Sequence, residues 1–199
     1  MHDPFPECDH DNDLAVRAAR DKVAFSVLFE RYFARVYNYM RFQTSDSASA
    51  DDLTAQVFEQ MLKNIQRFDK ERAPFNAWLF GIARNIINRH RRDLRRENHL
   101  PLEKDLEEKR DSGLEIESRI IHSAEIEELI AAMQGLDEKK RELLALKFAG
   151  RLTNRQISAL TGLSENNVGV ILFRTLNRLR TELENKAMEG LPDMERKNG

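Results

Sequence analysis

Residues 73–96 are the stretch that most constrains the fold, because apolar and basic side chains recur in it at a helical period. The apolar ones fall on one side of a helix: Phe75, Trp78, Leu79, Ile82, Ala83, Ile86 and Ile87. The other side begins with small residues and ends with arginines. Pro74 suits a first helical position, and about 22 residues give a rod of roughly 33 Å. Such a rod has one face for packing and one cationic face for a nucleic acid groove or a membrane surface.

The rest of the chain favours helices and a nucleic acid partner. Its 8 glycines and 5 prolines are too few for a turn-rich β protein. The net charge of −2 conceals segregation, because residues 84–96 hold six arginines against one aspartate, whereas residues 97–128 hold eleven acidic residues against four basic ones. No apolar run approaches the roughly 18 residues of a membrane span, so we expect no membrane insertion.

The first residues predict neither a targeting signal nor a metal site. Residues 1–12 are acidic, contain two prolines and show no apolar period, which is typical of a disordered tail without a signal peptide. His2, Cys8 and His10 are potential soft ligands, but their spacing matches no closed zinc pattern and a fourth ligand is missing. We therefore expect a cytoplasmic protein with no metal or cofactor.

The apolar pattern divides the chain into two helical parts. Residues 13–96 predict an N-terminal bundle of helices, and residues 123–186 predict a second helical domain. Between them, residues 97–122 read as an acidic flexible linker, and residues 187–199 as a tail. The expected fold class is all-α, with two small domains joined by that linker.

The second domain contains a helix-turn-helix pattern. Thr153 suits the cap of a short helix, Gly162 permits a tight turn, Leu163 fills it, and Ser164 suits the cap of a longer helix. Residues 151–180 hold five arginines and one acidic residue, Glu165, as expected of a segment that binds DNA phosphates. Helix pairs of this shape also occur in proteins that do not bind DNA, so the pattern alone leaves both alternatives open.

Taken together, the two halves resemble the extracytoplasmic-function group of bacterial sigma factors, the promoter-recognition subunits of RNA polymerase. The resemblance in the first half is carried by LFERYFARVYNYM, ASADDLTAQVFEQM and FNAWLFGIARNIINRHRR. In the second half it is carried by GLDEKKRELLALKFAGRLTNRQISALTGLSENNVGVILFRTLNRLR. The order and spacing of these segments are more specific than any one of them.

The resemblance implies an alternative sigma factor with three binding surfaces. It implies that the chain docks on the β′ and β subunits of core RNA polymerase through Asp51, Asp52, Leu53, Gln56 and Phe58. It assigns the capture and melting of the −10 element to these residues: Phe68, Asp69, Lys70, Arg72, Arg84, Asn85, Asn88, Arg91, Arg92 and Arg95. It assigns the binding of the −35 element to these residues: Arg155, Ser164, Asn166, Asn167, Val170, Arg174 and Arg178.

Three departures from the family pattern affect these expectations. Ala55 and Gln56 stand where a glutamine and a glutamate are usual, which weakens the charge argument for polymerase docking. Gly169 and Ile171 stand where a lysine and an arginine are common, and Arg89 replaces a common aspartate. We therefore expect binding to shift toward the −10 end.

Two further expectations concern partners and alternatives. The resemblance and the flexible linker imply an anti-sigma factor that holds the two domains together. The competing hypothesis is a free-standing helix-turn-helix regulator whose N-terminal bundle senses or oligomerises. An enzyme is not expected, because the sequence has no phosphate-binding glycine loop and no HExxH motif.

Overall fold

The computed structural model describes residues 7–44, 46–97 and 124–189, and helices alone make up its regular structure there. The helices are α1 (Glu7–Ala18), α2 (Lys22–Gln43), α3 (Ser47–Asn64), α4 (Phe75–Glu97), α5 (Ala124–Gln134), α6 (Glu138–Phe148), α7 (Asn154–Thr161) and α8 (Glu165–Glu189), with the short 3₁₀ helix η1 (Ile65–Arg67) after α3. The expected all-α fold class is confirmed. The predicted linker, apart from its first residue Glu97, lies outside the described residues.

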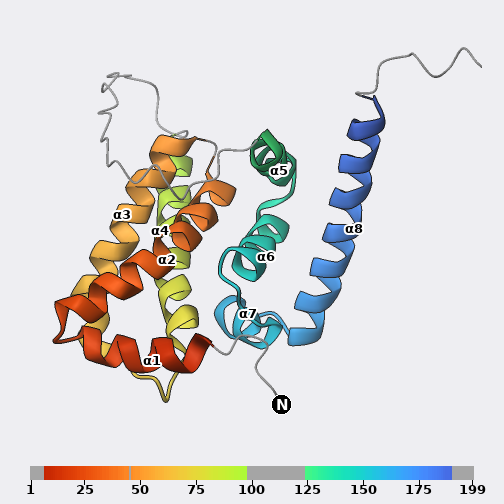
Figure 1. The fold of residues 1–199 in the computed structure, drawn as a ribbon. Helices are drawn as coiled ribbons and strands as arrows, with labels where there is room; N and C mark the ends of the chain where they lie inside the picture. The colour runs from red at the N-terminus through yellow and green to blue at the C-terminus, as the bar shows by residue number, and fades with distance from the viewer. Residues whose placement is uncertain (1–6, 45, 98–123, 190–199) are drawn as a thin grey trace, which may run out of the picture.

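Helices α2, α3 and α4 lie side by side, and α1 crosses one end of them (Figure 1). Aspartates begin two of these helices, since the side chain of Asp21 accepts from the backbone N–H of Val23 and that of Asp46 from Ser49. The core of this bundle is rich in aromatic rings, and several pairs meet edge-on, as Tyr32 does with Phe75 at 5.0 Å between centroids. The bundle therefore fixes the orientation of α4.

Several sequence-based boundaries are wrong. Glu7–Asn12 were expected in a disordered tail but belong to α1, because Asp11 and Asn12 find partners on other helices. The helix α4 continues through Glu97, into the expected linker, and α8 continues through Glu189, into the expected C-terminal tail.

The helix-turn-helix is confirmed as α7 and α8. Thr153 and Gln156 form a reciprocal capping box at the start of α7. Gly162 has a φ of 75°, a left-handed conformation that favours glycine, and it ends α7. Ser164 then caps α8 by accepting from the backbone N–H of Asn167 at 3.3 Å.

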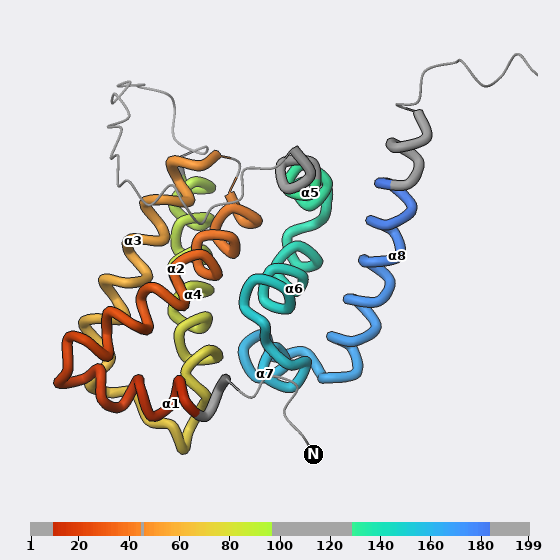
Figure 2. Tube along the Cα trace, viewed as in Figure 1, coloured from red at the N-terminus to blue at the C-terminus, as the bar shows by residue number. Residues whose placement is uncertain are grey.

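The two groups of helices pack against each other. In Figures 1 and 2, α5 and α6 lie between the N-terminal bundle and α8, and α6 contacts α2 while α7 contacts the start of α4. Arg35 fixes this arrangement by donating to the backbone carbonyls of Ala149, at 3.3 Å, and Gly150, at 2.5 Å. No helix among the described residues is long and apolar enough to cross a membrane.

Candidate nucleic-acid interface

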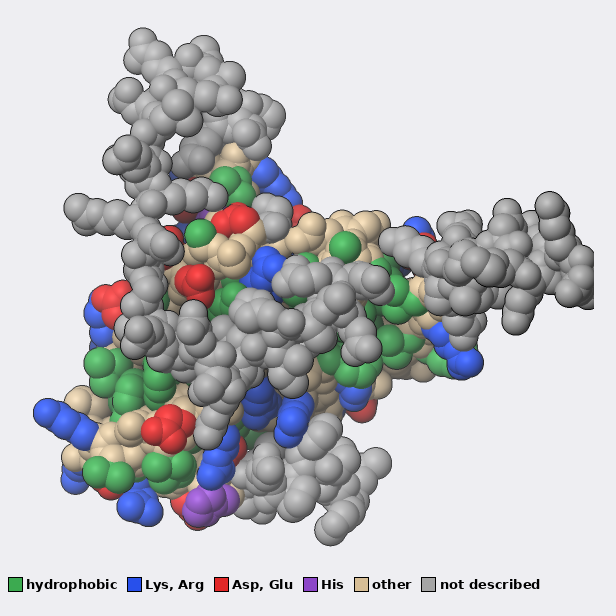
Figure 3. Space-filling view, turned by 45° about the horizontal axis from the view of Figure 1, so that its top comes forward, with side chains coloured by type: hydrophobic (Ala, Val, Ile, Leu, Met, Phe, Trp, Pro, Cys, Tyr) green, Lys and Arg blue, Asp and Glu red, His purple; other side chains and the backbone are tan. Residues whose placement is uncertain are grey.

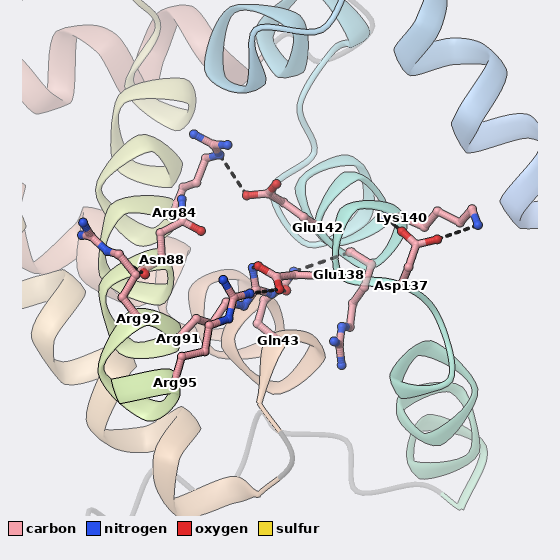
Figure 4. Close-up of polar contacts among 11 residues, drawn as sticks. Gln43, Arg84, Asn88, Arg91, Arg92, Arg95, Asp137, Glu138, Lys140 and Glu142 are labelled. Atoms are coloured by element: carbon pink, nitrogen blue, oxygen red, sulfur yellow. Dashed lines mark hydrogen bonds and ion pairs between the residues drawn. The ribbon is translucent and has the colours of Figure 1, made fainter. Parts of the chain in front are cut away.

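The basic side of α4 faces α6. Arg84, Arg91 and Arg95 are separated by seven and four residues, so they lie along one side of the helix. Two carboxylates of α6, Glu138 and Glu142, stand one helical turn apart and point at these arginines (Figure 4). We call these five residues the ion-pair cluster.

Each arginine of the ion-pair cluster has a carboxylate partner. The Nε of Arg84 lies 2.9 Å from Oε1 of Glu142. Glu138 serves two arginines, because its Oε1 lies 2.9 Å from Nη1 of Arg91 and its Oε2 lies 2.7 Å from Nη2 of Arg95. These are charge-assisted hydrogen bonds of normal length, which are stronger than neutral ones.

The cluster is partly shielded from water. The side chains of Arg91 and Glu142 are each 11% exposed, whereas that of Arg95 is 65% exposed. Arg91 also donates to the side-chain oxygen of Gln43 on α2. Because ion pairs with little solvent access are screened weakly, the pairs made by Arg84 and Arg91 are the strongest of the cluster.

A buried hydroxyl group lies near these charges without a hydrogen-bond partner among the described residues. It belongs to Tyr39, which is fully buried and packs edge-on against Phe80 at 5.6 Å. Burial raises the pKa of the Tyr39 hydroxyl far above its ordinary value, and the Glu142 carboxylate raises it further, whereas Arg91 and Arg84 lower it. A buried unpaired hydroxyl destabilises the packing around it.

The remaining residues of α4 assigned to the −10 element lie apart from the cluster. Arg92 is exposed, points to another side of the helix and donates to the backbone carbonyl of Asn88 at 3.3 Å (Figure 4). Asn85 is also exposed, and Asn88 is half-buried. Arg92 and Asn85 therefore offer donors to a partner without any rearrangement.

The loop before α4 is less open than expected. Phe68 is buried against Phe75 and Trp78, at 5.7 and 5.4 Å between ring centroids, so it supports the loop and is not available to stack on a base. Asp69 accepts from the backbone N–H of Glu71 within the loop. Lys70 pairs with Asp13 of α1 at 2.9 Å.

A hollow of about 740 Å³ lies between the start of α4 and α7. It brings Arg72 and Asn85, both assigned to the −10 element, together with Arg155, assigned to the −35 element. Trp78 lines it as well. The packing of α7 on α4 therefore merges residues that the sequence assigned to two separate DNA sites.

Helix α8 and Ser164, the residue before it, present the side chains assigned to the −35 element to solvent. Ser164, Asn166, Asn167, Val170, Arg174 and Arg178 are all exposed, although Arg178 pairs with Glu182 at 2.7 Å. A hollow of about 860 Å³ lies on this side, where Gly169 contributes no side chain. Phe173, which the sequence reading missed, also lines it and is 66% exposed.

The expected polymerase-docking residues divide into two sets. Asp51 and Asp52 are exposed, and burial together with Asp52 raises the pKa of Asp51. Leu53 and Phe58 are buried in the core, so they position α3 without reaching a partner. Gln56 accepts from Arg89 of α4 at 3.4 Å.

The described residues contain no cluster of three or more potential metal ligands. On the side seen in Figure 3, the Lys and Arg side chains that are not covered form several groups. Sequence reasoning missed Glu138 and Glu142, because nothing in the sequence around a carboxylate identifies a partner on a distant helix. The one available signal was their spacing of four residues, which equals the spacing of Arg91 and Arg95.

Comparison with known families and relatives agrees with these features. Residues 28–97 match the family model described as Sigma-70 region 2, and residues 126–179 match the one described as Sigma-70, region 4. The chain is 30% identical to "ECF RNA polymerase sigma factor RpoE" of Cereibacter sphaeroides over 85% of this chain and 91% of that one. It is 28% identical to "ECF RNA polymerase sigma factor BldN" of Streptomyces coelicolor over 92% and 70%, respectively.

Two solved structures have the same fold. CnrH, solved in complex with the cytosolic domain of CnrY, superposes with a TM-score of 0.62 at 24% identity, covering 88% of this chain and 97% of that one. RpoE of Bartonella quintana, solved with the anti-sigma factor NepR, superposes with a TM-score of 0.63 at 20% identity, covering 80% and 96%.

Proposed function

The chain belongs to the extracytoplasmic-function group of RNA polymerase sigma factors, as an alternative sigma factor that directs transcription initiation, and we propose which of its surfaces perform this function. The proposal is carried by one observation above all. A region 2 bundle precedes a region 4 helix-turn-helix in one chain, and each presents arginines and amides on a helix surface.

The −10 element meets α4 and the loop before it. Arg84, Arg91, Arg92 and Arg95 contact backbone phosphates, since guanidinium groups along one rod match a row of negative charges. Base choice belongs to Arg72 and Asn85, because an amide and a guanidinium are the groups that read base edges. Phe68 supports the start of α4 by packing against Trp78, which lies beside them.

The −35 element meets the exposed side of α8. Asn166, Asn167 and Val170 lie in the first turns of the recognition helix, the part that enters a major groove. Arg174 and Arg178 follow one and two turns later, where they reach phosphates. The support is the exposure of all these residues, of which Asn166, Val170 and Arg174 line one hollow.

Core RNA polymerase binds through α3. Asp51 and Asp52 are the contact residues on the exposed side of this helix, and Leu53 and Phe58 hold the helix in place from the core. Its surface suits a partner with basic groups, which the β′ and β subunits of polymerase would supply.

The chain acts as a regulatory DNA-binding protein in the cytoplasm and has no enzymatic activity of its own. An anti-sigma factor is a further partner, as it is for RpoE of Bartonella quintana in its solved complex. Such a partner would inhibit the chain by covering the surface of α3 that binds polymerase or the side of α8 that binds the promoter.

Transcription in vitro tests the proposal. Purified core polymerase, genomic DNA and the full chain are combined, and the 5′ ends of the transcripts are sequenced. We expect new start sites that share two motifs, and we expect Asn166→Ala and Arg174→Ala to change use of the upstream motif alone. If the chain binds duplex DNA specifically but core polymerase yields no new start sites, the free-standing regulator is the correct function.

A further inference from the structure

The ion-pair cluster joins the DNA-binding side of α4 to the C-terminal helices of the same chain. We propose that Glu138 and Glu142 of α6 occupy the places of DNA phosphates on α4, so that the free protein holds its −10 surface closed until the two domains separate. The proposal rests on the proposed assignment of Arg84, Arg91 and Arg95 to phosphates. The partner of this surface is therefore the chain's own second domain.

Charge and spacing support the substitution of carboxylates for phosphates. Glu138 and Glu142 are four residues apart, so about 6 Å separates them along α6. They provide a short row of negative charge parallel to the arginines, and all three arginines are satisfied by it. DNA cannot contact these arginines while the carboxylates remain in place.

The same arrangement holds α7 against the start of α4, where it forms one wall of the hollow that Arg72 and Asn85 line. The two helices are closely packed there, because a side-chain methyl on Gly81 of α4 would lie only 3.4 Å from Leu160 of α7. Gln156 of α7 donates to the side chain of Asn76 at 3.4 Å. Opening for DNA thus requires α6 and α7 to leave α4 together.

The closed arrangement also contains a feature that favours opening. The hydroxyl of Tyr39 is buried near Arg84, Arg91 and Glu142 without a hydrogen-bond partner among the described residues. When the domains separate and water reaches this hydroxyl, it gains a hydrogen-bond partner that it lacks in the closed arrangement. The unpaired hydroxyl therefore shifts the equilibrium toward the open arrangement. Removing the hydroxyl should therefore strengthen closure, whereas neutralising the carboxylates should weaken it.

These opposite effects define the experiment. Glu138→Gln/Glu142→Gln preserves shape but removes both negative charges, and the matched control is Glu30→Gln/Glu59→Gln, which removes two exposed carboxylates outside the cluster. Tyr39→Phe is the third variant. Each full-length chain is spin-labelled through Leu62→Cys on α3 and Lys139→Cys on α6, with Cys8→Ser, and distances are measured by pulsed electron paramagnetic resonance.

Binding is measured on the same chains, with a fluorescein-labelled random-sequence DNA duplex as the probe. If the closed form makes up most of the free protein, opening it raises affinity by the inverse of the open fraction, and we expect at least a roughly fivefold gain over the control for Glu138→Gln/Glu142→Gln. Its label distances should lengthen and broaden. Tyr39→Phe should narrow the distances and weaken binding about twofold or more.

Two results would overturn the inference, and they differ. Unchanged distances in Glu138→Gln/Glu142→Gln would show that the carboxylates do not hold the domains together, and the sigma function would be unaffected. Longer distances without tighter DNA binding than the control would show that the released arginines do not meet phosphates. That second result would also overturn the proposed −10 surface, while transcription with core polymerase would still report the function independently.

Discussion

Asn12 of α1 accepts a hydrogen bond, 2.7 Å long, from the backbone N–H of Phe75, the first residue of α4. The first N–H groups of a helix have no partner within it, and an asparagine is among the best residues to satisfy one of them. Here the capping side chain comes from another helix, 63 residues earlier in the chain. Asn12 therefore couples the placement of α1 to the start of α4.

Replacing this cap should destabilise the N-terminal bundle. We expect Asn12→Ala to lower the free energy of unfolding by about 1 kcal/mol, the usual loss for a helix cap, and Asn12→Asp to retain most of it, because a carboxylate also accepts the N–H. Urea unfolding followed by circular dichroism measures both. Equal losses for the two variants would mean that the hydrogen bond does not cap α4.

Arg91 and Arg92 are neighbours in sequence, but their surroundings predict different phenotypes. Arg92→Ala removes an exposed side chain that, among the described residues, bonds only the carbonyl of Asn88, so stability should change by less than about 0.5 kcal/mol. The salt dependence of DNA binding to the polymerase-bound protein should fall by about 0.9 for one lost phosphate contact. An unchanged slope would remove Arg92 from the −10 surface.

For Arg91→Ala we expect a structural loss as well. This side chain is 11% exposed and bonds both Glu138 and Gln43, so within the described part of the chain its removal leaves the Glu138 carboxylate with Arg95 as its one arginine partner. A partly shielded network broken in this way costs roughly 1 to 3 kcal/mol, which thermal unfolding would detect. Equal stability of Arg91→Ala and Arg92→Ala would contradict the importance of the ion-pair cluster.

The fold followed from the sequence where local chemistry determines it. The capping box of Thr153 and Gln156 and the left-handed turn at Gly162 are properties of a few neighbouring residues, and the structure has them as expected. The apolar period of residues 75–87 likewise predicted most of the buried side of α4, although Trp78 and Ile82 are only partly buried and Phe80, outside that period, is fully buried. Local patterns were sufficient for the helices and their order.

Contacts between distant segments could not be predicted in the same way. Residues 7–12 show no apolar period, because polar side chains attach this part of α1 to the bundle. Asp11 accepts from the hydroxyl of Tyr32 at 2.6 Å, and Asn12 caps α4. Glu142 lies 58 residues from Arg84, and no pattern within α6 identifies that pairing. Phe68 was assigned to the −10 element, but its burial depends on where Phe75 and Trp78 pack.

The turn of the helix-turn-helix should not tolerate a charge. Leu163 is half-buried beside the turn, and its carbonyl accepts from the hydroxyl of Ser158 at 2.6 Å. We expect Leu163→Asp to unfold the second domain, losing roughly 2 kcal/mol or more, because an unpaired carboxylate would enter the apolar contact. Leu163→Met should cost less than about 1.5 kcal/mol. Survival of −35 binding in Leu163→Asp would show that the turn is packed differently.

Acid should weaken the start of α6, where Asp137 is the cap. Its side chain accepts from the backbone N–H of Lys140 at 3.0 Å and pairs with the Lys140 ammonium at 2.6 Å. The hydrogen bond from the Lys140 side chain, followed by that from its backbone N–H, lowers the pKa of Asp137 below its ordinary value. The ionised carboxylate is therefore more favourable in the folded chain than in the unfolded one.

The sign of the pH effect follows from this lowered pKa. The stabilisation by Asp137 is complete above the ordinary aspartate pKa, near 4, and is lost as the pH falls through the lowered value of the folded chain. Asp137→Asn keeps an uncharged cap that does not titrate. We expect the wild type to be the more stable of the two in urea at about pH 7, with the difference shrinking toward about pH 3. A difference that stays constant or grows in acid would mean that Lys140 does not favour the ionised form of Asp137.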